Sequence, residues 1–166
     1  MRGTEPSGNG RLPGLDAVFG ELRPGESREI SLLLASAREE YIRFFHPFPF
    51  TAEAVFSLLA SARRDRYWGI RCGGELCGIV TLRGLDEGYA RPAFGIFVAE
   101  RFANRGLCKL ALGHAFDWLK ANQIPTVILK VSKEHAIARR LYINAGFEFA
   151  GICPNSGFDI LEKRLE

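Results

Sequence analysis

Short apolar runs separated by polar turns predict a chain that alternates between strands and helices. The strand-like runs cover residues 17–22, 67–72, 76–82, 93–98, 126–131, 147–153 and 158–165. The runs at 67–72 and 76–82 flank Gly73-Gly74-Glu75, which predicts a β-hairpin. The run 126–131 is nearly all apolar, as expected of a strand buried on both faces.

Apolar residues at helical spacing predict the remaining elements. The expected helices cover residues 26–37, 38–45, 51–63, 106–122 and 134–145. Thr51 is a candidate N-cap of the third helix, and Pro47 and Pro49 prevent the second from continuing. Gly146 follows the last helix directly and suits its C-terminal cap.

The element order and composition predict one mixed α/β domain. Residues 1–14 are rich in Gly, Pro, Ser and Asn, so we expect a flexible N-terminal tail followed by a single domain over residues 15–166. The formal net charge of +3 comes from scattered arginines, which gives no strong case for nucleic acid. The first residues lack the apolar core of a signal peptide and no run is long enough to span a bilayer, so we expect a cytoplasmic protein with no membrane partner.

The four cysteines show no metal-binding spacing. They stand at positions 72, 77, 108 and 153, without a CxxC pair or a matching histidine pattern, so we expect no metal. Cys72 and Cys77 flank the predicted hairpin turn. They are either two small apolar side chains or, alternatively, a disulfide.

The segment RFANRGLCKLAL, residues 101–112, follows a predicted strand and leads into a predicted helix. The first N–H groups of a helix lack carbonyl partners, and the helix dipole is positive there, so a phosphate is a natural ligand. Gly106 would let an anion approach the backbone, and Arg101 and Arg105 would add positive charge. The alternative is an ordinary structural turn.

A second segment, HAIARRLYINAGF at residues 135–147, places Tyr142 on one helix face with Ala138 and Leu141. Taken alone, this pattern indicates a half-buried core tyrosine.

Together the two segments resemble the GNAT superfamily of N-acetyltransferases over about residues 60–153. In the family's Arg/Gln-x-x-Gly-x-Gly/Ala motif, Gly106 fits the first glycine, whereas Ala103 and Cys108 depart from the pattern. In its Asn-x-x-Ala-x-x-Leu-Tyr-x-x-x-Gly-Phe motif, only the asparagine is replaced, by His135. The matching residues are Ala138, Leu141, Tyr142, Gly146 and Phe147.

The resemblance implies a mixed, mostly antiparallel central sheet with helices on both faces, and acetyl-CoA as co-substrate between two splayed parallel strands. Those strands would be residues 93–98 and 126–131. The cofactor-binding residues would be Ile96, Phe97, Val98, Ala103, Asn104, Arg105, Gly106, Leu107, Cys108 and His135. Tyr142 would protonate the departing CoA thiolate after direct amine attack, and a backbone N–H near Phe97 would meet the carbonyl oxygen.

The acceptor amine must lose a proton, and the sequence offers several bases. The acidic candidates are Asp86, Glu87 and Glu100, and the second choices are His46 and His114. We take Tyr142 and Glu100 as the candidate catalytic residues. The aromatic segment FFHPFPF places Phe45, His46 and Phe48 as the substrate-binding candidates. We expect a small-molecule amine acceptor, such as an amino sugar, and a monomer or homodimer. The alternatives are a peptide or protein N-terminal acetyltransferase and a non-catalytic acyl-CoA-binding domain.

Overall fold

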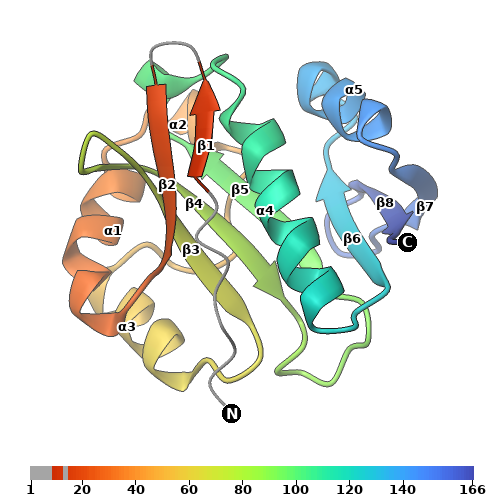
Figure 1. Ribbon diagram of the computed structural model, residues 1–166, viewed down its shortest axis with the longest axis horizontal. Coiled ribbons are helices and arrows are strands. Elements are labelled where there is room, and N and C mark those ends of the chain that lie inside the picture. Colours follow the sequence, from red (N-terminus) through yellow and green to blue (C-terminus); the bar gives the residue numbers. More distant parts are fainter. Residues whose placement is uncertain (1–8, 13–14) are drawn as a thin grey trace.

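The computed structural model describes residues 9–12 and 15–166, which form one eight-stranded sheet and its covering helices (Figure 1). The strands are β1 (Asn9–Leu12), β2 (Leu15–Glu21), β3 (Arg66–Cys72), β4 (Glu75–Arg83), β5 (Ala93–Val98), β6 (Thr126–Val131), β7 (Glu148–Ile152) and β8 (Asp159–Arg164). The helices are α1 (Ser27–Ala35), α2 (Glu39–Ile42), α3 (Ala52–Ser61), α4 (Leu107–Ala121) and α5 (Ala136–Asn144), with 3-10 turns η1 (Pro24–Glu26) and η2 (Glu100–Phe102).

Seven of these strands are those that the apolar runs predict, and β1 is the exception. It pairs antiparallel with β2 inside the segment expected to be a tail. That expectation is corrected for residues 9–12, because backbone hydrogen bonds to a neighbouring strand do not require apolar side chains. Residues 1–8 and 13–14 of the expected tail lie outside the described part of the chain.

The predicted helices are all present, and each is shorter than its predicted range. Thr51 caps α3 as expected, its hydroxyl oxygen accepting a hydrogen bond from the Ala54 N–H at 3.2 Å. The expected helix over residues 38–45 shortens to the four residues of α2. Gly106 is the N-cap of α4 rather than its first residue, with a left-handed φ of 79°.

The sheet is antiparallel except at its centre. Its strand order is β1-β2-β3-β4-β5-β6-β8-β7, and β5 and β6 are the parallel pair. In Figure 1, α4 crosses the front of the sheet, and β6, β7, β8 and α5 lie beyond it. This is the mixed, mostly antiparallel sheet that the sequence predicts.

Alternating residues of the sheet build a core on each face. On β3, Trp68 enters the cluster beneath α4, whereas Tyr67 enters the cluster beneath α1 and α3. On β4, Val80 and Ile79 divide in the same way. Because successive side chains of a strand point to opposite faces, both faces of the sheet are apolar and both are covered by helices.

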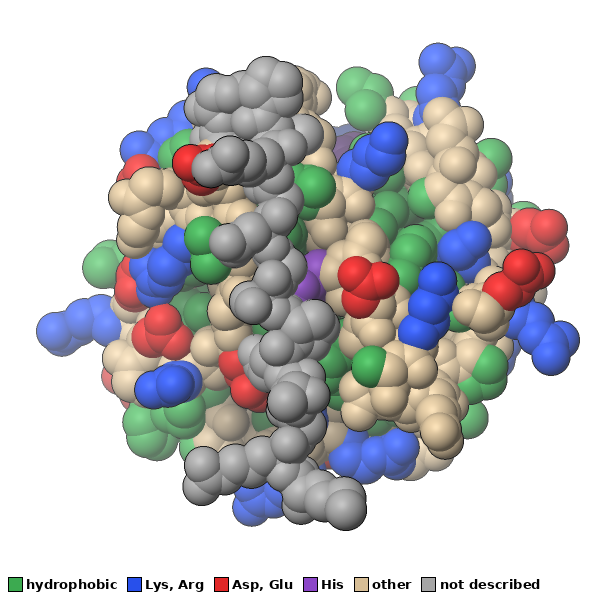
Figure 2. All heavy atoms as spheres, viewed as in Figure 1, with side chains coloured by type: hydrophobic (Ala, Val, Ile, Leu, Met, Phe, Trp, Pro, Cys, Tyr) green, Lys and Arg blue, Asp and Glu red, His purple; other side chains and the backbone are tan. Residues whose placement is uncertain are grey.

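The described helices and the face drawn in Figure 2 bear on the membrane and nucleic-acid expectations. None of the helices in the described residues is long and apolar enough to cross a bilayer. On the face drawn in Figure 2, Lys and Arg side chains are spread among Asp and Glu side chains. This distribution matches the scattered arginines of the sequence.

Candidate functional site

The parallel strands β5 and β6 separate after a short contact. Their register contains only the pairs Ala93↔Ile128 and Phe94↔Leu129. The rest of β5 stays paired with β4 on its other edge, as far as Val98 opposite Gly78. The end of β5 therefore has one edge that β6 does not cover, and an extended ligand can pair with such an edge.

A tight backbone turn lies between the end of β5 and helix α4. Asn104 and Gly106 both adopt left-handed conformations, with φ of 61° and 79°. The first helical hydrogen bond runs from the Leu110 N–H to the Gly106 carbonyl at 3.2 Å. The amides that precede Leu110 lie at the positive end of a 15-residue helix, which suits an anion.

Tyr142 projects from α5 into the core cluster beside this opening. Only 8% of its surface is exposed, and its ring packs edge-on against Phe94 and Phe147, with centroid distances of 6.4 and 6.0 Å. Its hydroxyl neighbours the thiol of Cys108. Burial, and then the neighbouring Cys108, raise the pKa of Tyr142 well above its ordinary value. Tyr142 is therefore a fully protonated phenol at neutral pH.

Cys108 occupies the second position of α4, where the GNAT motif has a small residue. Its side chain packs against the core cluster and meets the Tyr142 hydroxyl. Burial raises the pKa of the Cys108 thiol to about 11, despite the opposing effect of the neighbouring Tyr142 hydroxyl. This thiol is neutral at pH 7 and is poorly suited to act as a nucleophile.

Helix α2 touches the β5 side of the opening through two polar contacts. The Tyr41 hydroxyl donates to the Val98 carbonyl at 2.5 Å. The guanidinium of Arg38 donates to Glu100 in η2, with Nε to Oε2 at 2.9 Å and a second, shorter bond to Oε1. These contacts attach α2 to the end of β5 and to η2, which follows it.

The other end of α2 reaches the segments around β6 and β8. Arg43 pairs with Glu134 at 2.9 Å. The Phe44 ring lies 5.3 Å from that of His135 and 6.2 Å from that of Phe158. Helix α2 and the residues after it therefore bridge both sides of the splayed strands. These partners lie far apart in the sequence, and no local pattern predicted the contacts of Arg38, Tyr41 or Phe44.

The aromatic segment after α2 packs on the face of β5 that carries Phe97, opposite the face that carries Phe94. The Phe45 ring is 5.8 Å from that of Phe97, and Phe45, Phe48 and Phe50 all pack against the second core cluster. His46 is exposed at the surface and stacks on Phe50 at 5.3 Å. The segment contributes to the core and also forms the wall behind Phe97.

The remaining base candidates, Asp86, His114 and Glu87, lie in three different environments. The Asp86 carboxylate accepts hydrogen bonds from the backbone N–H groups of Arg63, Arg64 and Asp65, at 3.0, 2.6 and 3.3 Å. His114 is buried, with only 8% of its surface exposed, in the core beneath α4. Glu87 is exposed. The described residues contain no group of three or more His, Cys, Asp or Glu side chains placed to hold a metal ion.

The splayed strands, the helix end and the buried tyrosine are the arrangement that the sequence motifs predict. The sequence profile of the acetyltransferase (GNAT) family matches residues 34–147. The chain belongs to the GNAT family. Its fold class and its family are thus those recognised from the two motifs.

Individual GNAT relatives agree with this assignment. The chain is 24% identical over 116 residues to the Bacillus subtilis protein named "Putative ribosomal N-acetyltransferase YdaF", a match that covers 62% of this chain and 63% of that protein. RimJ of Mycobacterium smegmatis, solved with CoA-disulfide, superposes with a TM-score of 0.74 at 17% identity, covering 95% of this chain and 86% of that one. RimL, titled an alpha-N-protein acetyltransferase of a ribosomal protein and solved with coenzyme A, gives 0.76 at 10% identity, covering 90% and 94%.

These findings place the protein among the GNAT acyltransferases. The two solved structures show a common fold, and the family match shows the enzyme class. The family is one of acetyltransferases, and the chain spans 63% of the length of the curated relative that it matches.

Proposed function

We propose that this protein transfers the acetyl group of acetyl-CoA to the terminal amine of a protein or peptide. The observation that carries the choice of acceptor is the similarity to a relative named as a putative ribosomal N-acetyltransferase and to a solved structure named as a ribosomal alpha-N-protein acetyltransferase. The structure adds the chemical parts that such a transfer needs: an uncovered strand edge, a helix end and a buried phenol.

The residues around the opening fit the co-substrate. The amides from Asn104 to Cys108 would bind an anion at the start of α4, whereas the Ala103 N–H already donates to the Glu100 carbonyl at 3.0 Å. The left-handed Gly106 brings no side chain into that turn. Cys108 packs its sulfur into the core, so the departure from the small motif residue is accommodated there. We assign the edge of Ile96, Phe97 and Val98 to the extended pantetheine arm, and His135 to the opposite wall.

Acetyl-CoA supplies an activated acetyl thioester, and Tyr142 supplies a proton. When the amine attacks the acetyl carbon, the sulfur leaves as a thiolate and needs a proton or a hydrogen bond. Tyr142 remains protonated at neutral pH because burial raises its pKa, so its hydroxyl always has a proton to donate. The backbone N–H near Phe97 would hold the carbonyl oxygen as it gains charge.

The acceptor amine must reach the site neutral, and Glu100 is the acidic candidate next to β5. The hydrogen bond from Arg38 lowers the pKa of Glu100, so the carboxylate is a weak base near neutral pH. We therefore assign Glu100 to holding α2 in place, and the loss of the amine proton to water. A terminal α-amine, with an ordinary pKa of about 8, needs less help than an alkyl amine of about 10.4.

An amino sugar or other small amine is the second candidate acceptor. It is favoured by the aromatic segment Phe45, His46 and Phe48, which faces β5 near Phe97 and would stack on a ring or an apolar group. On this reading the same residues would bind the small acceptor instead of the first residue of a peptide.

A panel of acceptors separates the two candidates. The protein is incubated with acetyl-CoA and, in parallel, with peptides carrying free amines, the same peptides with blocked N-termini, an amino sugar and a polyamine. Thiol release is followed together with product mass. We expect acetylated peptide only where the terminal amine is free. Turnover of the amino sugar without turnover of any peptide would reverse the assignment.

A further inference from the structure

A pair of cysteines outside the proposed site is placed for its own chemistry. We propose that Cys72 and Cys77 form an oxidisable dithiol that a hydroperoxide converts into an intramolecular disulfide. This proposal is independent of the acceptor and of the role of Tyr142. The thiols belong to the β3–β4 hairpin, where Gly73 and Gly74 form the turn with φ of 60° and 83°.

The two sulfur atoms are already in contact. Cys72 Sγ and Cys77 Sγ lie 2.7 Å apart, and both cysteines are reduced. A β-bulge causes this contact: the register shifts between Ile70 and Arg71, so that Cys77 is the extra residue on β4. Both side chains enter the same core cluster, and a bond between them requires little movement of the backbone.

The surroundings favour a small oxidant and assign an order to the two thiols. Cys72 is 7% exposed and Cys77 is fully buried, with its thiol donating to the Ile70 carbonyl at 3.2 Å. Burial, followed by the Cys72 contact, raises the pKa of Cys77, so Cys77 stays a thiol. Cys72, next to the exposed Gly73-Gly74 turn, is therefore the sulfur that meets the oxidant first.

The chemistry balances with hydrogen peroxide as the only co-reactant. The Cys72 sulfur attacks one peroxide oxygen, the O–O bond breaks, and Cys72 becomes a sulfenic acid as one water is released. The Cys77 sulfur then attacks the Cys72 sulfur, the S–S bond forms, and the hydroxyl leaves with the Cys77 proton as a second water. The two thiols lose two protons and two electrons, and one peroxide takes them up and is reduced to two waters.

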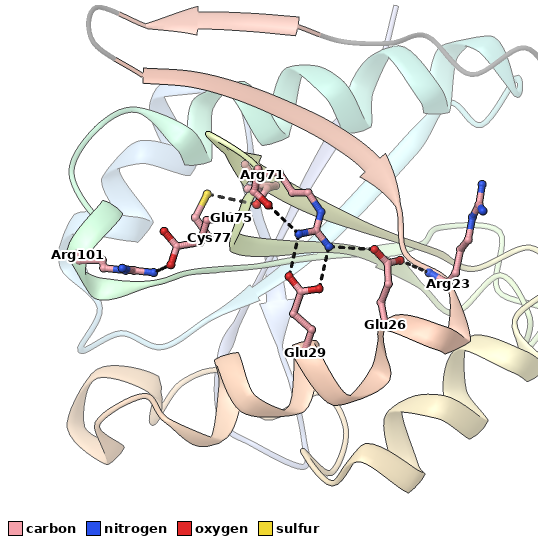
Figure 3. A network of polar contacts seen from close by, with 9 residues as sticks. Arg23, Glu26, Glu29, Arg71, Glu75, Cys77 and Arg101 are labelled. Atoms are coloured by element: carbon pink, nitrogen blue, oxygen red, sulfur yellow. Dashed lines mark hydrogen bonds and ion pairs between the residues drawn. The ribbon is translucent and has the colours of Figure 1, made fainter.

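The tip of the β3–β4 hairpin is ion-paired to two other parts of the molecule. A crosslink in the hairpin would therefore also affect the segments that contact it. Figure 3 shows Arg71 between Glu26 and Glu29 near α1, with contacts of 3.0 and 2.8 Å. On the other side, Glu75 pairs with Arg101 of η2.

A backbone bond adds to these ties, since the Cys77 carbonyl accepts the Ala99 N–H at 2.8 Å. The segment after β5, which leads to α4, thus rests on the residue that the disulfide would fix. A disulfide that fits the native hairpin reduces the conformational entropy of the unfolded chain without straining the folded one. The oxidised protein should therefore melt at a higher temperature.

The test uses the full chain and needs no activity assay. The protein is treated with hydrogen peroxide, unfolded, alkylated without reduction and digested with trypsin, which cuts after Arg71 and Arg83 and releases both thiols in one peptide, residues 72–83. We expect this peptide to be two hydrogens lighter and unalkylated, to recover two alkyl groups after dithiothreitol, and the oxidised protein to show a raised melting temperature. The Cys77→Ala variant should show neither change.

Two results would overturn the proposal. One is a treated peptide 72–83 that still takes two alkyl groups. The other is overoxidation of Cys72 to a sulfinic acid without a crosslink. Cys108, which has no neighbouring thiol among the described contacts and whose pKa is raised to about 11 by burial, serves as the internal control and should remain alkylatable.

Discussion

The two walls of the site are held by different kinds of interaction. The co-substrate wall consists of the β5 edge, the turn before α4 and Tyr142, and it depends on backbone geometry within short segments. The acceptor wall consists of α2 and the aromatic segment after it. It is held by two ion pairs and one hydrogen bond between residues 57 to 91 positions apart, and by ring contacts of Phe44 and Phe45 with distant segments. Short motifs can therefore identify the chemistry of this enzyme while leaving its acceptor open.

Removing the Tyr142 hydroxyl should have the largest effect. Tyr142→Phe keeps the buried ring but removes the proton proposed for the leaving sulfur, so we expect kcat to fall by about 100-fold or more. The KM for acetyl-CoA should change little, because the amides of the helix end are intact. Steady-state thiol release over a range of acetyl-CoA concentrations measures both constants.

Tyr89→Phe is the matched control, since that tyrosine is 61% exposed and should leave both constants unchanged. An unaltered kcat in Tyr142→Phe would remove the acid role and leave Tyr142 as a core residue.

The same contrast explains what the sequence could predict. The hairpin turn, the Thr51 cap and the strand β6 are local signals, and each occurs where the pattern places it. The expectation that β6 is buried on both faces is wrong, because Val127, Leu129 and Val131 are buried whereas Lys130 on the other face is exposed. The strand β1 was not predicted, because its pairing with β2 is made by backbone groups that the composition does not reveal.

The side-chain contacts of the acceptor wall were not predicted either, for a related reason. Arg38 and Glu100 carry no local mark of their pairing, and α2 is too short to show helical periodicity. Glu100 was identified as an acidic candidate from its position alone, and only the contact with Arg38 reveals the hydrogen bond that lowers its pKa.

A smaller effect is expected from the ion pair that holds α2. Glu100→Gln and Arg38→Gln should each lower kcat/KM for the acceptor by less than about five-fold, because both side chains are largely exposed. The double variant should be no worse than either single variant, since both remove the same contact. A base role for Glu100 predicts something else: a large loss in Glu100→Gln alone, with the acidic limb of the pH–rate profile abolished.

The smallest effect concerns α4 away from either wall. His114 stacks on Phe19 at 4.7 Å and meets Trp68 edge-on at 4.8 Å, and its Nε2 has no hydrogen-bond partner among the described residues. Burial lowers the pKa of His114, so below about pH 6.5 the unfolded chain binds a proton that the native state resists. The free energy of unfolding should therefore decrease as pH falls from 7 to 5.5.

His114→Phe should flatten this decrease, by at most about 1.4 kcal/mol per pH unit. The measurement is urea unfolding at several pH values, with exposed His46→Gln as the control. Parallel pH profiles for wild type and His114→Phe would show that the buried imidazole is protonated without cost.

Amide hydrogen exchange with and without acetyl-CoA tests the account of the co-substrate wall most directly. We predict that the ligand slows exchange in residues 96–98 and 103–108, with little change in α1 and α3. Protection centred on α1 and α3, with residues 103–108 exchanging as before, would contradict the placement of acetyl-CoA between β5 and β6.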